Sequence, residues 1–196
     1  MKTIKLMVLG LLVVASYNCK EVKKEAEKAG DAMEESADDM MDNEETVGSV
    51  QFSMEPKSDS DVTGEVTFTE ENGEIKMMAN LSGLSVGDHA IHIHQDADCS
   101  SDDGKSAGGH WNPTNQPHGK WGADEGYHKG DIGNFTADAR GDATVEFSTS
   151  EWCMGCDDEN KNILGKAVIV HQGQDDFTSQ PSGDAGARVS CTGIIQ

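Results

Sequence analysis

The run GDHAIHIHQ, residues 87–95, is the strongest structural signal in this chain. Side chains alternate between the two faces of an extended strand, so His92 and His94 share one face. Ile91 and Ile93 share the opposite face, which is typical of a strand that packs on a core. The histidine face leaves two imidazoles free to bind a metal. Two exposed histidines on a surface strand are the alternative that this run alone leaves open.

Eight segments are predicted as short strands, because turn-forming residues separate runs of alternating or apolar side chains. Turns are expected at residues 71–74 and 140–142, where Asn, Gly and Asp gather. Eight short strands in one domain predict an all-β sandwich or barrel. The predicted strands are Ser49–Met54, Thr63–Thr69, Glu74–Leu81, His89–Gln95, Gly133–Ala137, Thr144–Ser148, Lys166–His171 and Arg188–Ile194.

Further candidate ligands follow the first histidine pair: His110, His118, His128, Asp131 and His171. The segment 96–131 is rich in Gly, Asn, Asp and Pro, which predicts a loop. So long a loop needs something to organise it within a compact domain, and three imidazoles and a carboxylate around one zinc ion would do so. His171 ends an apolar run, as a ligand at a strand end would, although a capping or partly buried histidine is the alternative.

Residues from about 47 to 196 resemble the copper/zinc superoxide dismutase family. The matching motifs are GDHAIHIHQ, GGHWNP, HKGDIGN, GKAVIVHQGQDD and GDAGARVSC, and they occur in the family's order. The resemblance implies an eight-stranded Greek-key β-barrel or sandwich with long metal-binding and electrostatic loops. The implied activity is the dismutation of superoxide to dioxygen and hydrogen peroxide by a redox-cycling copper bridged to a structural zinc.

The resemblance also implies a role for individual residues. The zinc ligands would be His110, His118, His128 and Asp131, and the copper ligands His92, His94, His110 and His171. His110 would bridge the two metals and carry a proton during catalysis, and Arg188 would guide the anionic substrate. Asp175 would hydrogen-bond one ligand of each metal, and His89 would be structural. The loop before Arg188 is shorter than in many eukaryotic members, and Pro181 stands where a lysine is common.

Two other functions remain alternatives. A copper/zinc-binding envelope protein, which stores or delivers metal with little turnover, would use the same scaffold. Members of that kind typically lack some copper ligands or the arginine, whereas this chain keeps them all. A β-sandwich that binds only a structural zinc would leave His92, His94 and His171 without a purpose.

The five cysteines predict an oxidised protein. By resemblance, Cys99 and Cys191 form the disulfide that ties the long loop to the last strand. Cys153 and Cys156 form a C-x-x-C pair in a stretch that is longer than the family usually has, and a local disulfide is expected in an exported protein. A redox pair or a third metal site stays open, although a redox C-x-x-C usually lies beside a βαβ unit and two cysteines do not complete a zinc site.

The N-terminus predicts export. Residues 1–5 carry two lysines and residues 6–15 are apolar, a run too short to span a bilayer and typical of a signal peptide. Cys19 follows closely, so we expect residues 1–18 to be a lipoprotein-type signal and Cys19 to be lipidated. Residues 16–18 depart from the usual small-residue pattern, so cleavage after Ala15 and secretion is the alternative. Residues 19–46 are expected to be a charged tether, weakly helical or disordered.

The net charge of −21 restricts the partners, and −16 of it lies in the expected domain, residues 47–196. Nucleic-acid binding requires a basic footprint, so no nucleic acid is expected. An acidic domain is also repelled by anionic lipid, and we expect membrane contact only through the N-terminal lipid anchor, in a periplasmic or membrane-anchored envelope protein. Superoxide is the expected small-molecule partner, and both a monomer and a homodimer are compatible with the sequence.

Overall fold

The computed structural model describes residues 48–195, so the predicted signal peptide, Cys19 and the tether lie outside the described residues. The described part contains eight strands and one short 3-10 helix, η2 (Lys105–Ala107). The strands are β1 (Gly48–Pro56), β2 (Thr63–Glu71), β3 (Glu74–Ser82), β4 (Gly87–His94), β5 (Gly133–Ala137), β6 (Ala143–Thr149), β7 (Ala167–His171) and β8 (Arg188–Gly193). Within this part of the chain, no helix has the length and apolar character needed to cross a membrane.

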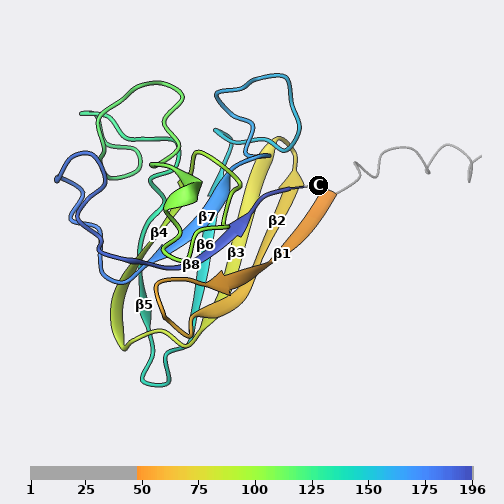
Figure 1. The fold of residues 1–196 in the computed structure, drawn as a ribbon. Coiled ribbons are helices and arrows are strands. Elements are labelled where there is room, and N and C mark those ends of the chain that lie inside the picture. The colour runs from red at the N-terminus through yellow and green to blue at the C-terminus, as the bar shows by residue number, and fades with distance from the viewer. Residues whose placement is uncertain (1–47, 196) are drawn as a thin grey trace, which may run out of the picture. The chain divides into compact units, whose positions relative to one another are not determined.

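The eight strands form one antiparallel sheet in the order β5-β4-β7-β8-β1-β2-β3-β6 (Figure 1). Its two edge strands, β5 and β6, approach each other, so the sheet curls into a nearly closed barrel. The chain passes from β4 through β5 and β6 before β7 returns to pair with β4, which is a Greek-key connection. The prediction of an all-β, eight-stranded Greek-key barrel is confirmed.

The core follows from alternation along the strands. In β3, Ile75, Met77, Ala79 and Leu81 are buried, and the residues between them are exposed. The predicted strands agree with the observed ones except at their ends. Strand β4 ends at His94 and not at Gln95, because the backbone N–H of Gln95 donates to the carbonyl oxygen of Gly109 in the following loop.

Strand β4 is buried on both faces, as a central strand between β5 and β7 should be. Ile91 and Ile93 belong to the hydrophobic core, whereas His92 and His94 are covered by loops. The loop after β4 (residues 95–132, mainly green) and the loop after β7 (residues 172–187, blue) both lie beside β4 on the left of Figure 1. These two loops and the histidine face of β4 enclose the candidate site.

Candidate metal centre

Four histidines form the first candidate ligand group: His92, His94, His110 and His171. His92 and His94 come from β4, His171 ends the adjacent strand β7, and His110 comes from the long loop. All four are buried, and they offer ring nitrogens that lie within 4.8 Å of one another. Strand pairing explains the arrangement, because His92 on β4 lies opposite Ile169 on β7, and the alternation of side chains then puts His92, His94 and His171 on the same face of the sheet.

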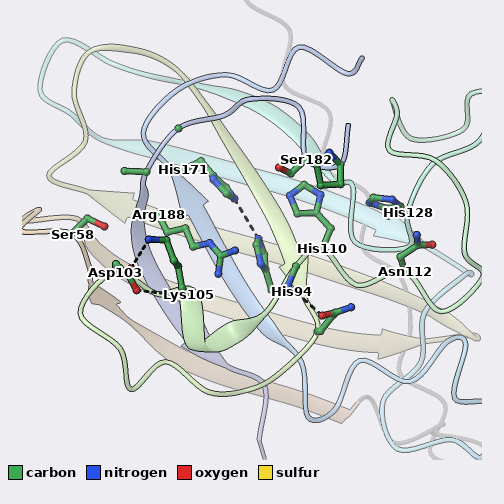
Figure 2. Close-up of a pocket in the computed structure, with 15 residues that line it drawn as sticks. Ser58, His94, Asp103, Lys105, His110, Asn112, His128, His171, Ser182 and Arg188 are labelled. Carbon is green, nitrogen blue, oxygen red and sulfur yellow. Dashed lines mark hydrogen bonds and ion pairs between the residues drawn. The ribbon is translucent and has the colours of Figure 1, made fainter. Parts of the chain in front are cut away.

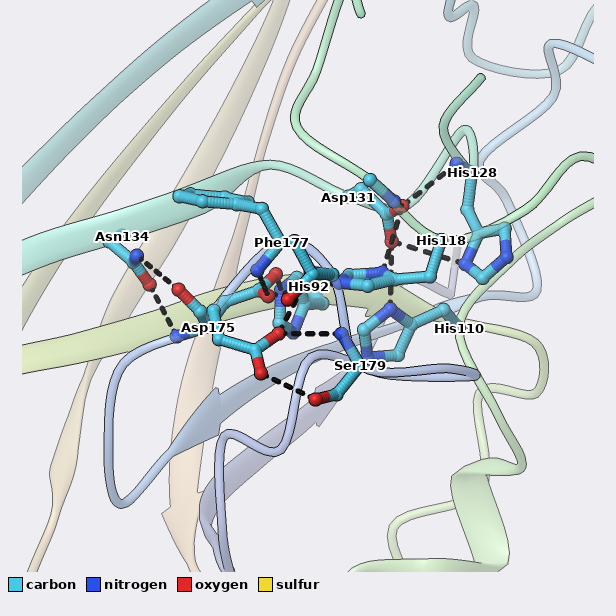
Figure 3. A network of polar contacts seen from close by, with 12 residues as sticks. His92, His110, His118, His128, Asp131, Asn134, Asp175, Phe177 and Ser179 are labelled. Carbon is cyan, nitrogen blue, oxygen red and sulfur yellow. Dashed lines mark hydrogen bonds and ion pairs between the residues drawn. The ribbon is translucent and has the colours of Figure 1, made fainter. Parts of the chain in front are cut away.

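The second group consists of His110, His118, His128 and Asp131, and its nitrogens surround one carboxylate. The Asp131 oxygens lie 2.8 Å from Nδ1 of His110, 3.0 Å from Nδ1 of His118 and 3.2 Å from Nδ1 of His128. The backbone N–H groups of Gly119 and His128 also donate to Asp131 Oδ2, over 3.1 and 2.8 Å. Figure 3 shows the three imidazoles arranged around this completely buried carboxylate.

Asp175 links the two groups. Its Oδ2 accepts a hydrogen bond of 2.9 Å from Nε2 of His92, and its Oδ1 accepts one of 2.9 Å from Nε2 of His118. A neutral imidazole that donates through Nε2 keeps a lone pair on Nδ1, so both rings present Nδ1 as a ligand atom. His94 is held the opposite way, because its Nδ1 donates to the Gly108 carbonyl over 3.0 Å and leaves Nε2 free. That Nε2 lies 3.4 Å from Nε2 of His171.

The side chains present fit bound cations. Within residues 48–195, the buried side-chain atoms without a hydrogen-bond partner are all histidine ring nitrogens: Nδ1 of His92, His118, His128 and His171, and Nε2 of His110. Buried polar atoms are nearly always paired, and an unpaired one costs stability. Metal coordination satisfies an imidazole lone pair, and imidazoles suit both copper and zinc.

The electrostatics divide the centre into two halves. Burial, together with neighbouring histidines, lowers the pKa of His94 and of His171 well below the ordinary value. Burial also lowers the pKa of His110 to about 4, against the opposing effect of Asp131. Burial acts in the same direction on His118, but the adjacent carboxylates of Asp131 and Asp175 outweigh it and raise the pKa to about 9. His94, His110 and His171 are thus neutral imidazoles near pH 7, whereas the carboxylates beside His118 favour its positive charge.

Both carboxylates stay ionised in this setting. Burial would raise the pKa of Asp131, but the hydrogen bond from His110, the nearby rings of His118 and His128 and the hydrogen bond from the His128 backbone N–H hold it far below its ordinary range. The pKa of Asp175 is likewise low, because hydrogen bonds from His118 and His92 outweigh its burial. Two buried negative charges among imidazoles favour a divalent cation.

Three residues that the sequence analysis did not identify hold the loops in place. Asn134 on β5 exchanges two hydrogen bonds with the backbone of Asp175. The side-chain amide of Gln180 accepts from the backbone N–H of His118 and donates to its carbonyl oxygen, each over 2.9 Å. Gly183 has φ +71°, and a Cβ there would collide with the carboxylate of Asp175. Asn134 stands inside the motif HKGDIGN, which was the available signal for it, whereas nothing local points to Gln180.

A cavity of about 590 Å³ opens beside the first ligand group (Figure 2). His94, His110, His171 and Arg188 line it, with Lys105 and Asp103 at its rim. The guanidinium of Arg188 donates from Nη1 to the carbonyl of Gly104 and from Nη2 to that of Gly108, each over 2.7 Å. Burial lowers the pKa of Arg188 somewhat, but a guanidinium remains charged at neutral pH. The cavity therefore places a fixed positive charge beside the imidazoles.

Both pairs of cysteines are bonded. Cys99 and Cys191 form a disulfide that joins the long loop to β8, across a sequence separation of 92 residues. Cys153 and Cys156 form a second disulfide in the loop after β6. Disulfides persist in oxidising compartments, so the two bonds are consistent with an exported protein.

Known proteins are similar to this chain in sequence and in fold. The profile of the family described as "Copper/zinc superoxide dismutase (SODC)" matches residues 62–195. Aligned with the extracellular superoxide dismutase [Cu-Zn] of Caenorhabditis elegans, the chain is 32% identical, and the match covers 69% of the chain and 62% of the relative. With superoxide dismutase [Cu-Zn] 2 of Aquifex aeolicus it is 32% identical over 71% of the chain and 82% of the relative. With superoxide dismutase [Cu-Zn] of Botryotinia fuckeliana it is 36% identical over 71% and 92%.

Solved structures show the same similarity at the level of the fold. A SOD-like protein from Bacillus subtilis superposes with a TM-score of 0.66 at 27% identity, covering 74% of this chain and 97% of that one. A double mutant of the same protein gives 0.67 at 30% identity with the same coverage. The chain therefore belongs to the copper/zinc superoxide dismutase family, whose enzymes use copper and zinc as cofactors.

Proposed function

We propose that the protein dismutates superoxide at a copper ion held by His92, His94, His110 and His171. A zinc ion held by His110, His118, His128 and Asp131 would lie next to it, with His110 as the shared ligand. The observation that carries this proposal is the pairing at His110: its Nδ1 lies 2.8 Å from Asp131, and its Nε2 is buried without a partner. One ring thus presents a nitrogen to each ligand group.

The overall reaction takes two superoxide ions and two protons to one dioxygen and one hydrogen peroxide. Copper, when bound, supplies the one-electron oxidation and reduction, while zinc has no redox chemistry. The chain's own residues bind the anion, exclude other reactions and deliver protons. Because Nδ1 of His110 is held in the second group, its Nε2 is the atom that would carry a proton between turnovers.

Arg188 is proposed to hold the substrate. Its guanidinium is fixed by two backbone carbonyls and lines the same cavity as His94, His110 and His171. A planar and permanently charged donor suits a small anion. Lys105 at the rim is paired with Asp103 over 2.8 Å, so part of its charge is neutralised. Arg188 is therefore the principal attraction for superoxide in a domain with a large negative charge.

The test is metal analysis alongside superoxide consumption on the purified protein. The proposal predicts one copper and one zinc per chain, and superoxide loss that is first order in the loaded protein. Copper and zinc binding without superoxide consumption would contradict the proposal and favour the alternative of a metal-storing or metal-delivering envelope protein.

We also propose that the protein is anchored in the cell envelope by lipid on Cys19. The support is the order of a basic segment, a short apolar run and a cysteine within residues 1–19. Labelling with radioactive palmitate in the native host should mark the full-length protein and leave a Cys19→Ala variant unmarked. Absence of label on the wild-type protein would favour secretion without a lipid.

A further inference from the structure

The loop after β6, here called the C-x-x-C loop (residues 150–166), contacts the turn that carries two of the proposed zinc ligands. That turn, residues 127–131, contains His128 and Asp131. The indole Nε1 of Trp152 donates to the carbonyl oxygen of Lys129 over 2.8 Å. The carboxylate of Glu151 accepts a hydrogen bond of 2.8 Å from the Tyr127 hydroxyl and forms an ion pair with Lys129.

These contacts involve the residues on either side of His128 and do not touch its imidazole. Tyr127 precedes it and Lys129 follows it, and both are held by the adjacent pair Glu151 and Trp152. The turn has no helix or strand of its own to fix it. The C-x-x-C loop therefore holds the first half of the turn around His128, while the backbone of Gly130 is held by Ile93 of β4 and by Trp111.

Glu151 and Trp152 are themselves anchored. The Trp152 side chain is 1% exposed and packs in an aromatic cluster with Trp121 and Phe147, at ring-centroid distances of 5.8 and 5.0 Å. The residue after Trp152 is Cys153, whose backbone N–H donates to Lys161 and whose carbonyl accepts from Ile163. The Cys153–Cys156 disulfide closes a short ring directly beyond these contacts, with Cys153 buried and Cys156 half-buried.

We infer that Glu151 and Trp152 are positioning residues for the zinc site, and that the Cys153–Cys156 disulfide holds them in place. A ligand that is already in its bound position loses less conformational entropy when the metal binds, so the support raises metal affinity. This assigns a role to the C-x-x-C pair that needs neither thiol redox chemistry nor a third metal. The inference rests on the proposed zinc ligands.

The test measures zinc release from the copper-free, zinc-loaded, full-length protein into an excess of the chromophoric chelator 4-(2-pyridylazo)resorcinol. Glu151→Gln removes the ion pair with little change in shape, Tyr127→Phe removes one hydroxyl, and a Cys153→Ala/Cys156→Ala double variant removes the disulfide. Glu159→Gln is the matched control, because Glu159 is an exposed carboxylate of the same loop. The visible spectrum of the cobalt-substituted proteins reports the ligand geometry separately.

We expect Glu151→Gln and the double cysteine variant to release zinc on the order of 10-fold faster, with altered cobalt spectra, and the control to match the wild type. Unchanged release in Glu151→Gln and Tyr127→Phe, both of which should fold, would overturn the inference. Faster release in Glu151→Gln with an unchanged double cysteine variant would overturn the role of the disulfide. A wild-type protein that binds no zinc would overturn the proposed zinc site as well, so the two failures are distinguishable.

Discussion

Asn134 and Asp175 exchange a pair of hydrogen bonds across 41 residues of sequence. The Asn134 amide donates to the carbonyl oxygen of Asp175 over 2.8 Å, and the Asp175 backbone N–H donates to Asn134 Oδ1 over 2.7 Å (Figure 3). Asp175 in turn binds His92 from one ligand group and His118 from the other. Asn134 touches no proposed ligand, yet through Asp175 it is linked to one histidine of each group.

We predict that Asn134→Ala weakens the binding of copper and of zinc together. Loss of the paired hydrogen bonds frees the backbone of Asp175, and supporting residues of this kind typically contribute 10- to 100-fold to affinity. Competition titrations with chelators of known affinity measure both constants. Thr136→Ala, on the same strand and with a hydroxyl bonded only to Asp88, is the control. An effect on one metal alone would show that Asp175 does not couple the groups.

Electrostatic steering should be weak and should depend on Arg188. The domain charge of −16 repels superoxide, while Arg188 attracts it locally, and at 0.1 M salt charges that lie beyond about 10 Å are largely screened. The second-order rate constant of the wild type should fall only shallowly as ionic strength rises. Arg188→Ala should lower the rate and remove or reverse that fall. A steep fall that survives this substitution would mean that another positive surface guides the substrate.

The long-range disulfide should contribute strongly to stability. Cys99–Cys191 joins residues 92 apart, and closing so long a loop in the unfolded chain is worth on the order of 4 kcal/mol in the chain-entropy model. We expect a Cys99→Ser/Cys191→Ser variant to lose about 2–5 kcal/mol of unfolding free energy in urea titrations. Peptide mapping of the non-reduced protein checks the pairing, and a cross-link between Cys99 and Cys156 would contradict the framework.

Glu151 should make stability depend on pH in the acid range. Burial raises its pKa, but hydrogen bonds from Lys129 and Tyr127 and the charge of Lys129 hold it below the ordinary 4.5. Because the folded-state pKa is depressed, the ionised carboxylate stabilises the fold above pH 4.5 and the contribution is lost as pH falls through the lower folded pKa.

Urea unfolding of the metal-free protein between about pH 3 and pH 7 tests this. Glu151→Gln should be less stable than the wild type near neutrality, and the two curves should converge toward the acid end. A stability difference that stays constant over the whole range would show that ionisation of Glu151 does not contribute.

Alternation and turn residues were sufficient to predict the eight strands, because inward-facing residues such as Ile75 and Met77 repeat with the period of a strand. Strand ends were less predictable. Gln95 continues the pattern of β4, but its N–H bonds to Gly109 in a loop whose path the sequence does not reveal.

In the candidate site, too, some residues could be predicted from the sequence and others could not. The structure brings together all the residues that the sequence predicts for the two candidate ligand groups, and all of them except His118 stand inside the matching motifs. Two of the supporting residues, Gln180 and Trp152, lie outside those motifs and act on backbone atoms. Gln180 holds His118 from 62 positions away, and Trp152 holds Lys129 from 23 positions away. Such contacts depend on how two loops pack, which no local pattern in the chain records.

We propose that superoxide reacts at a copper held by His171 together with His92, His94 and His110. The test compares the rate of superoxide decay in the presence of the wild-type protein and of His171→Ala. Both proteins are first loaded with copper and zinc and analysed for metal. We predict that His171→Ala keeps its zinc, because His171 belongs only to the first ligand group, while it loses copper and nearly all activity. Full activity in His171→Ala would contradict the assignment of the site.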